Sequence, residues 1–495
     1  MASATITRPA PGPDAVPGRG RGRWSWPLIL LCALVVGILA GFLAYPTYPN
    51  YDSYYSLLWG REVLHGIKPS FDGYRTPTEH PLAVAFGALL SLAGDPADRI
   101  MVGATFGSLI VLAAGVYRLG RASFGTLVGL TAATLLLTRF DFPFLAARAY
   151  IDIPYLAFVM WAAALEAERP RRGLPVFLLL ACAGLMRPDA WVLSGLYYLW
   201  WAWPEGWSRR IRYAALTAAA PLLWIAVDWW ATGDPKFSLT HTSGLAEELG
   251  RTRGLAEVPS ATVQFLKNLD KVPVFYAGIL GVILALLLTP RRVRMPLALL
   301  VVGLGTFVLV GVAGLSVIDR YLLVPSLVVM IFASVSLSGW SMLRAGWLRK
   351  LWAAGAVVLV AYGAVYTVTR VTFSSFTIEL AFRGDSHQSL RKLLNDPRVR
   401  AGLRCGPLST PNHKLIPDSR WLLDAGPRGV IARSDVRQRH RIQHGVALYA
   451  VGRQSLLRQG FTSGDDSPED TANSIPMPGF TFVTATAYYG AYVRC

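Results

Sequence analysis

Hydrophobic runs of about 17–20 residues, separated by short polar stretches, recur along most of this 495-residue chain. A helix of about 20 apolar residues is long enough to cross a bilayer, and it satisfies its own backbone hydrogen bonds. The pattern therefore predicts an all-α polytopic membrane protein with about eleven transmembrane helices. We expect the first two at 27–45 and 100–117, the seventh at 213–230 and the eleventh at 351–368.

Two stretches depart from this pattern. The apolar run at 82–93 is too short to cross a bilayer comfortably, so we expect it to lie in the interface or to re-enter it. Residues 370–495 are mostly polar, and the alternating segments 445–451 (GVALYAV) and 480–485 (FTFVTA) predict strands. This part of the chain is expected to form a small α/β domain.

Composition and charge also indicate a membrane protein. Hydrophobic residues make up 53% of the chain, charged residues 16%, and the mean hydropathy is +0.40, whereas a soluble protein needs more polar surface. The net charge of +18 comes with no groove-reading motif, so no nucleic acid is expected as a partner. The arginines instead gather in short loops, which are typical of the cytoplasmic side. These loops hold Arg118 and Arg121; Arg169, Arg171 and Arg172; Arg209, Arg210 and Arg212; Arg291, Arg292 and Arg294; Arg344, Arg349 and Lys350.

Placing those loops inside the cell fixes the expected topology. It gives a disordered cytoplasmic tail at 1–23, a transmembrane domain at 24–369 with outer segments 46–99 and 231–271, and an extracytoplasmic domain at 370–495. Segment 231–271 could be a mobile lid or an ordinary long connection. Cys405 and Cys495 could form a disulfide or remain two free thiols. The excess of arginine over lysine indicates a GC-rich bacterial genome. The expected location is the bacterial plasma membrane.

The same topology brings most of the unusual ionisable residues to the outer face. They are Asp52, Arg61, Glu62, Glu79, His80, Arg148, Asp152, Arg187, Asp189, Asp319 and Arg320. Single members have simpler interpretations: Arg148 and Arg187 could snorkel to the interface. Asp152 could cap a helix, and Asp319 could pair locally with Arg320. As a group, however, several carboxylates and three arginines suit an anionic phosphate substrate and a general base.

Four short motifs follow one another along the first two thirds of the chain. They are the pattern Asp52, Tyr54-Tyr55, Arg61-Glu62, Gly66 and His80-Pro81, and the strings ARAYIDIP, GLMRPDAW and RYLLVP. Together these motifs resemble the outer loops and a late span of the GT-C fold glycosyltransferases, the lipid-linked-sugar enzymes related to protein mannosyltransferases and to the aminoarabinose transferases of lipid A. The C-terminal region resembles, in position only, the soluble extracytoplasmic domain of many members.

The resemblance implies an inverting glycosyltransferase with a polyprenyl-phosphate sugar as donor and a glycan, lipid or protein hydroxyl as acceptor. It implies that Asp52 is the catalytic base and that the lipid tail of the donor lies in the membrane. Substrate-binding roles are expected for Arg61, Glu79, His80, Arg148, Asp152, Arg187, Arg320 and Tyr321. No cofactor is assigned. Since Ser53 and Tyr54 follow Asp52 where many members have a second acid, a Mg²⁺ or Mn²⁺ ion is left open rather than expected.

Two other function classes stay open at this point. A secondary transporter would carry ionisable residues near the bilayer centre, in unwound helices. The predicted spans are almost free of charge there, and Asp228 near a span end is the rare exception. A non-catalytic protein that binds or assembles lipid-linked precursors is not distinguished by the sequence.

Overall fold

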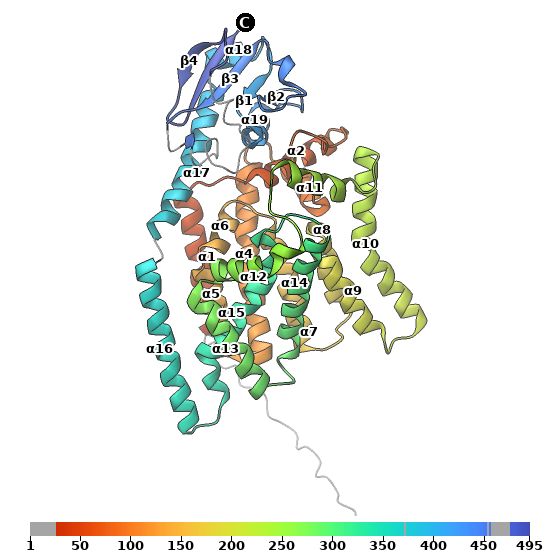
Figure 1. Cartoon of the computed structure of the whole chain (residues 1–495), viewed down its shortest axis with the longest axis vertical. Helices are drawn as coiled ribbons and strands as arrows, with labels where there is room; N and C mark the ends of the chain where they lie inside the picture. Colours follow the sequence, from red (N-terminus) through yellow and green to blue (C-terminus); the bar gives the residue numbers. More distant parts are fainter. Residues whose placement is uncertain (1–25, 371–372, 453–454, 457–475) are drawn as a thin grey trace, which may run out of the picture.

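A bundle of helices carries a small sheet at one end (Figure 1). The structure is a computed structural model and describes residues 26–370, 373–452, 455–456 and 476–495. The predicted tail at 1–23 lies outside these residues. The first half of the chain contains α1 (Trp26–Ala44), α2 (Tyr51–Leu64), α3 (Pro81–Ser91), α4 (Ala97–Phe124), α5 (Thr126–Thr138), α6 (Asp141–Ala147), α7 (Asp152–Glu168), α8 (Leu174–Met186), α9 (Asp189–Ala202), α10 (Trp207–Thr232) and α11 (Phe237–Glu248).

The remaining helices complete the bundle and lead into the sheet. They are α12 (Val258–Asp270), α13 (Val272–Leu288), α14 (Arg294–Val312), the 3₁₀ turn η2 (Asp319–Leu322), α15 (Leu323–Ser338), α16 (Trp347–Arg370), α17 (Phe373–Leu394), α18 (Pro397–Gly402) and α19 (Ile416–Leu423). The predicted spans coincide with α1, α4, α5, α7 to α10 and α13 to α16. The prediction of a mostly helical, multi-pass membrane fold is therefore confirmed.

The number of membrane crossings stays a prediction. By length and composition, five helices in the described residues could cross a membrane, or seven if each of two bent helix pairs is one span. The bent pairs are α5 with α6 and α12 with α13. Helix α8 has only 13 residues, so it is apolar but short for a crossing.

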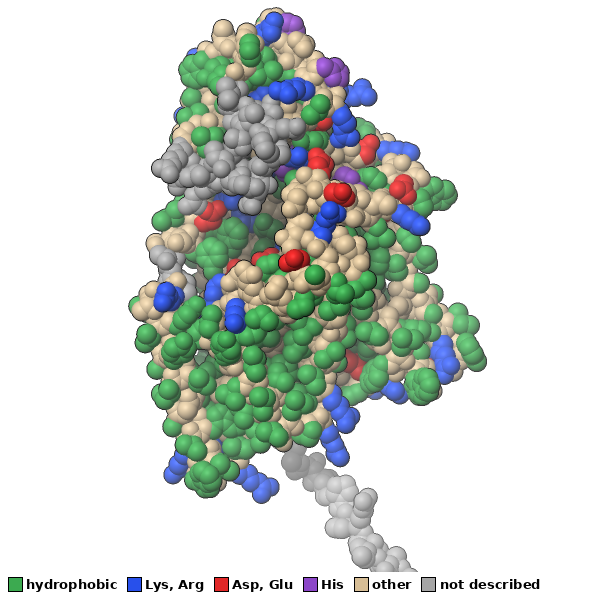
Figure 2. Space-filling view, viewed as in Figure 1, with side chains coloured by type: hydrophobic (Ala, Val, Ile, Leu, Met, Phe, Trp, Pro, Cys, Tyr) green, Lys and Arg blue, Asp and Glu red, His purple; other side chains and the backbone are tan. Residues whose placement is uncertain are grey.

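Burial separates a central helix from peripheral ones. In the segment that contains α15, 94% of the most apolar window is buried, because its side chains are apolar or small on every face. In α16 only 6% of that window is buried, and this helix stands at the edge of the bundle (Figure 1). Hydrophobic side chains cover much of the bundle surface, and basic side chains lie at the end far from the sheet (Figure 2).

Helices α2 and α3 cross so closely that two glycines are required. A Cβ atom on Gly60 would lie 2.2 Å from the backbone nitrogen of Ala88, and one on Gly87 would lie 2.2 Å from the carbonyl oxygen of Ser56. The predicted short run at 82–93 is thus the 11-residue helix α3, packed under α2. Asn50 caps α2 by accepting a hydrogen bond from the Ser53 amide at 3.0 Å.

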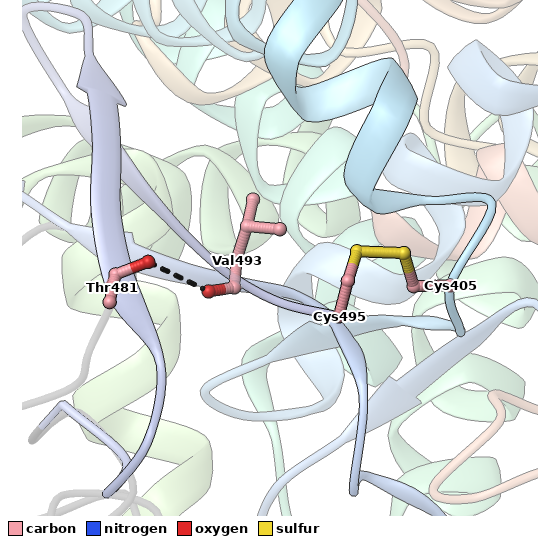
Figure 3. The surroundings of a disulfide bond; sticks show 4 residues. All are labelled: Cys405, Thr481, Val493 and Cys495. Atoms are coloured by element: carbon pink, nitrogen blue, oxygen red, sulfur yellow. Dashed lines mark hydrogen bonds between the residues drawn. A yellow bond between two sulfur atoms is a disulfide. The ribbon is translucent and has the colours of Figure 1, made fainter.

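The C-terminal region contains a mixed five-stranded sheet of order β2-β1-β3-β5-β4. Its strands are β1 (Leu408–Thr410), β2 (Val430–Ala432), β3 (Gly445–Ala450), β4 (Thr481–Ala485) and β5 (Tyr489–Arg494). Strand β1 is parallel to β2 and β3, whereas β5 is antiparallel to β3 and β4. Both segments predicted as strands are strands, and the α/β prediction is confirmed. A disulfide joins Cys405 to Cys495, with Cα atoms 5.4 Å apart (Figure 3), so the two cysteines are not free thiols.

Candidate functional site

Two arginines and three aspartates form one ion-pair network, here named the Arg–Asp cluster. Arg320 donates through Nε and Nη2 to Asp152 Oδ2 at 3.1 and 2.7 Å, and through Nη1 to Asp52 Oδ2 at 3.1 Å. Arg187 donates to the other oxygen of Asp152, and through Nε and Nη2 to Asp189 Oδ2 at 2.9 and 2.8 Å. Four residues singled out in the sequence, Asp52, Asp152, Arg187 and Arg320, are thus joined by charge-assisted hydrogen bonds.

Every member of the Arg–Asp cluster lies at the end of a helix. Asp52 is in the first turn of α2, and Asp152 and Asp189 are the first residues of α7 and α9. Arg187 follows the last residue of α8, and Arg320 lies in η2, directly before α15. Helix dipoles favour acidic side chains near helix N-termini, and all three aspartates occupy such positions.

These contacts decide between interpretations that the sequence left open. Arg187 is 6% exposed and paired with two carboxylates, so it does not snorkel to an interface. Asp152 opens α7 but the residue before it is the cap, and both of its oxygens bind arginines. Arg320 pairs with Asp52 and Asp152, and the described structure contains no ion pair between Arg320 and Asp319.

The Arg–Asp cluster is closed at one end and open at the other. The side chain of Asp152 is 0% exposed and that of Arg187 is 8% exposed, whereas Asp52 and Arg320 are 23% and 26% exposed. The second oxygen of Asp52 accepts no hydrogen bond from any residue that the structure describes. An incoming ligand would therefore meet one free carboxylate oxygen and one guanidinium at the accessible end.

Three tyrosine rings lie against the two guanidinium groups. Arg187 stacks over Tyr155 and Tyr321, with 5.3 and 5.1 Å from its central carbon to the ring centres. Arg320 lies 5.2 Å from the ring centre of Tyr150. Such contacts hold a guanidinium in place without using its hydrogen-bond donors. Tyr321 was expected in the site, so the structure brings it beside the cluster as well.

Two cavities meet at Arg320. Cavity A has a volume of about 10 Å³, which is about the space of one water molecule, and lies between α7, α9, α14 and α15; its lining includes Tyr155, Asp189, Leu193, Thr306, Tyr321 and Arg320. Cavity B has a volume of about 200 Å³ and lies against α6, α12 and η2; its lining includes Asp141, Phe144, Tyr150, Leu269, Asp319 and Arg320. The Arg320 guanidinium therefore contacts two spaces, a small one that Asp189 also lines and a larger one that Asp141 and Asp319 line.

His80 faces the same two arginines. Burial, together with the positive charges of Arg187 and Arg320, lowers the pKa of His80 to about 3, so the ring is neutral at physiological pH. Its buried Nδ1 atom has no hydrogen-bond partner among the described residues. His80 is therefore a neutral imidazole with an unused polar atom beside the Arg–Asp cluster.

Glu79 belongs to a different contact. It accepts hydrogen bonds from Trp224 Nε1 at 3.2 Å and from the hydroxyl of Ser238, which is also 2.8 Å from both carboxylate oxygens of Asp228. Burial and the neighbouring Asp228 raise the pKa of Glu79 to about 10. Glu79 thus ties segment 46–99 to α10 and α11 as a protonated, buried acid.

Two more expected site residues lie away from the cluster. Arg148 donates through Nη1 to the carbonyl oxygen of Tyr48 at 2.7 Å, which holds the chain just before α2. Arg61 forms an ion pair of 2.6 Å with Asp424 and stacks at 5.1 Å over Trp421, both in the C-terminal region. The structure gives Arg61 contacts between α2 and the C-terminal domain instead of contacts with the Arg–Asp cluster.

The sequence interpretation missed two residues of this site, Tyr150 and Tyr155, and grouped Asp189 with the ionisable residues of the outer face without giving it a role. All three lie in or beside the quoted strings ARAYIDIP and GLMRPDAW. Asp189 follows Arg187 by two residues, and Pro188 between them turns the chain so that both side chains meet. Their positions within three residues of Arg187 or Asp152 were the only indication in the sequence that they belong to the site.

The carboxylates of the cluster do not fit a divalent cation in this arrangement. A metal site needs several free oxygen ligands, but Asp52, Asp152 and Asp189 each bind a guanidinium. Among the described residues, no group of three or more His, Cys, Asp or Glu side chains is arranged to hold a metal ion. The positive charge at this site is supplied by the two arginines.

Comparison with solved structures identifies the fold. The chain is similar to ArnT from Cupriavidus metallidurans bound to undecaprenyl phosphate, with 12% identity, a TM-score of 0.56, and coverage of 94% of this chain and 97% of that one. It is also similar to the oligosaccharyltransferase AglB from Archaeoglobus fulgidus in complex with an inhibitory peptide and a dolichol-phosphate, with 12% identity, a TM-score of 0.54, and coverage of 95% and 75%.

Sequence comparisons add nothing to this result. No protein-family model matches the chain, and no curated protein matches it either. The structural similarity extends over both the helical bundle and most of the remaining chain. The chain therefore has the GT-C fold, as the four sequence motifs predicted.

Proposed function

We propose that this protein is a membrane glycosyltransferase that moves a sugar from a polyprenyl-phosphate donor to a hydroxyl acceptor. The observation that carries the proposal is the accessible ion pair of Asp52 and Arg320, in which Arg320 also lines both cavities. The compared ArnT and AglB structures contain undecaprenyl phosphate and a dolichol-phosphate, which supports a lipid-phosphate donor here. A base beside a phosphate-binding cation is what glycosyl transfer to a hydroxyl requires.

The donor phosphate would bind at Arg320. In the described structure this guanidinium binds Asp52 and Asp152, and its side chain is 26% exposed, so it remains accessible to a ligand. Arg187, fixed by Asp152 and Asp189, would position Arg320 through the shared carboxylate and add positive potential.

In the transfer step Arg320 stabilises the leaving phosphate, and Asp52 acts as the base. The acceptor oxygen forms a bond with the anomeric carbon, while the bond from that carbon to the phosphate oxygen breaks. The electron pair leaves with the phosphate and is stabilised by Arg320. Asp52 takes the acceptor proton, and His80 offers a neutral hydrogen-bonding group beside it. Attack from the side opposite the phosphate inverts the anomeric carbon.

The expected location is the bacterial plasma membrane, with the Arg–Asp cluster and the C-terminal domain outside the cytoplasm. The Cys405–Cys495 disulfide supports an oxidising environment for that domain, since such bonds are rare in the reducing cytoplasm. The basic end of the bundle lies far from the sheet, as this orientation requires (Figure 2). The domain boundaries at 24–369 and 370–495 are part of the proposal.

The test is a transfer assay with purified protein. A panel of radiolabelled polyprenyl-phosphate sugars is incubated with candidate glycan, lipid and peptide acceptors, and the release of polyprenyl phosphate is measured. Release that depends on both the donor and Asp52 supports the proposal. Donor binding with no turnover across the panel would favour a precursor-binding protein, and solute uptake into protein-containing vesicles would favour a transporter.

A further inference from the structure

Helix α17 connects the helical bundle to the C-terminal sheet and contacts the chain just before α2 (Figure 1). A Cβ atom on Gly384 would lie 2.4 Å from the carbonyl oxygen of Pro46, so this approach depends on the glycine. Two residues further along α17, the Ser386 hydroxyl lies 2.7 Å from the Tyr489 hydroxyl in β5. One helix therefore touches both the sheet and the segment that leads to Asp52.

His387 in α17 is a buried side chain that the proposed mechanism does not use. It is 4% exposed, and its ring stacks on that of Tyr48, with 3.7 Å between the ring centres and 20° between the planes. Its Nδ1 atom lies 3.3 Å from the Tyr54 hydroxyl, which donates to Asp98 at 3.1 Å. His387 thus contacts residues on both sides of Asp52 in the sequence, four before it and two after it.

Two carboxylates from different helices lie beside the His387 ring. Its Nε2 atom is 3.9 Å from Asp98 Oδ2 in α4, and its Nδ1 atom is 3.7 Å from Asp418 Oδ2 in α19. Asp98 is 1% exposed, so its carboxyl group needs polar partners inside the protein. The position of the ring is therefore determined by α4 and α19 together.

A second set of contacts holds the first turn of α2 against the chain before α7. The carbonyl oxygen of Arg148 accepts a hydrogen bond from the Asn50 amide at 2.8 Å, and the Ser53 hydroxyl donates to the carbonyl oxygen of Ala149 at 2.6 Å. Asp52 lies between Asn50 and Ser53. The place of its carboxylate is thus set by the backbone at 148–149 and by the imidazole ring in α17.

We infer that His387 is a positioning residue that sets Asp52 against Arg320. Its effect on the rate rests on the proposed transferase function, whereas its effect on geometry does not. Asp52 Oδ2 accepts a hydrogen bond from Arg320 Nη1 at 3.1 Å, and the two side chains are 23% and 26% exposed, so this contact is the least confined part of the Arg–Asp cluster. Through Tyr48 and Tyr54, the imidazole fixes the first turn of α2 so that Asp52 meets both Arg320 and the acceptor hydroxyl. The C-terminal domain thereby takes part in transfer without a residue that touches the reacting atoms.

The test measures the reactivity of the Asp52 carboxylate in the full-length protein in lipid nanodiscs. A water-soluble carbodiimide couples glycine ethyl ester to accessible carboxylates, and mass spectrometry gives the coupling rate at Asp52. In His387→Gln we expect this rate to rise about threefold, because the ion pair with Arg320 opens more often once the ring no longer holds α2. His440→Gln, the same change at an exposed histidine of the C-terminal domain, is the matched control and should leave the rate unchanged. The exposed acid Glu257 gives the reference rate within each sample.

The second readout separates kcat from KM. In His387→Gln, kcat for polyprenyl-phosphate release should fall about tenfold while the donor KM stays within about twofold, because a misplaced base slows the chemical step. Arg320 keeps its bonds to Asp152 in this variant, so donor binding is not expected to change. Should His387→Gln not fold, Tyr54→Phe replaces it with the same expected changes, since it removes the hydroxyl between His387 and Asp98 and keeps the ring.

The outcomes separate this inference from the proposed function. A wild-type coupling rate at Asp52 in folded His387→Gln and Tyr54→Phe proteins would overturn the positioning role, even if both variants were less stable. A raised donor KM with an unchanged kcat would overturn it too. Faster coupling at Asp52 in a protein that transfers no sugar from any donor would support the positioning role and overturn the transferase proposal instead.

Discussion

Arg320 and Asp152 are separated by 168 residues, yet two nitrogens of the Arg320 guanidinium bind the same carboxylate oxygen, at 3.1 and 2.7 Å. The third nitrogen of Arg320 reaches Asp52, so one side chain connects η2 with α7 and α2. Planar guanidinium groups can bridge two carboxylates in this way, whereas an ammonium group is a single point charge. The site therefore depends on an arginine at this position and not merely on a positive charge.

Arg320→Lys should reduce glycosyl transfer by about 100-fold, because one donor set aimed at the leaving phosphate is lost. The measurement is the initial rate of polyprenyl-phosphate release at saturating donor. Arg344→Lys, at an exposed position outside the cluster, is the control and should keep the wild-type rate. An unchanged rate and donor affinity in the Arg320→Lys protein would remove Arg320 from the phosphate-binding role.

Asp52→Asn should abolish transfer, with a loss of about 100-fold or more, while the protein still folds and inserts. The amide keeps the size of the carboxylate but cannot take the acceptor proton. Binding of undecaprenyl phosphate is expected to persist, so the variant should separate binding from chemistry. Glu257→Gln, at an exposed acid in segment 231–271, is the matched control. Full activity of Asp52→Asn would assign the base to another group.

The fold could be predicted from the sequence because the length of each apolar run can be counted along the chain. Runs such as 100–117 and 351–368 are helices in the structure, and the alternating segment 445–451 is a strand. The number of membrane crossings is harder to predict. Helix α8 has only 13 residues, and α5 and α6 are bent by 61° relative to each other. Whether such a helix crosses a membrane depends on its neighbours and on the membrane itself, which local apolarity does not encode.

The site was readable in part, for a geometric reason. Charged residues at the ends of apolar runs, such as Asp152 and Arg187, are conspicuous because placing a charge in a membrane costs free energy. Arg61 was grouped with Asp52 because the two are close in sequence. Nine residues along a helix are roughly two and a half turns, so Arg61 faces away from Asp52 and toward Asp424. The angle between Asp52 and Arg61 around the helix would have excluded Arg61 from the site. The pairing of Arg320 with Asp52 and Asp152 could be seen only in the tertiary structure.

Glu79→Gln should make the thermal stability less dependent on pH. Burial and Asp228 raise the pKa of Glu79 from 4.5 to about 10, so the folded protein keeps a proton that the unfolded chain releases above pH 4.5. This contribution is complete below pH 4.5 and is lost as the pH rises toward 10, with a slope of up to about 1.4 kcal/mol per pH unit. Unfolding midpoints of wild type and variant, measured in detergent from about pH 6 to 9, should converge at low pH and diverge at high pH. Parallel curves would contradict a protonated Glu79.

Cys405→Ala should destabilise the C-terminal domain by about 4 kcal/mol, because the disulfide closes a loop of 90 residues and restricts the unfolded chain. The measurement is the denaturant dependence of proteolysis within residues 397–452, with and without reductant. Cys182→Ala, at a free cysteine in α8, is the control and should show no such shift. Equal protease resistance of the reduced and oxidised wild type would show that the bond adds no stability.

Arg420→Met should loosen the C-terminal domain from α2. Arg420 Nη2 lies 2.5 Å from Glu62 Oε1, and the two side chains are 4% and 8% exposed. Removing Arg420 leaves the buried Glu62 carboxylate with only the amide and hydroxyl of Ser70 as donors, which costs about 3 kcal/mol. The double variant Arg420→Met with Glu62→Leu removes both charges and should recover most of that loss. The measurements are the unfolding midpoint and the protease sensitivity of residues 403–452. A double variant as unstable as the single one would show that the domain is held by the attraction between the two charges, and that the loss does not come from the carboxylate left without its charged partner.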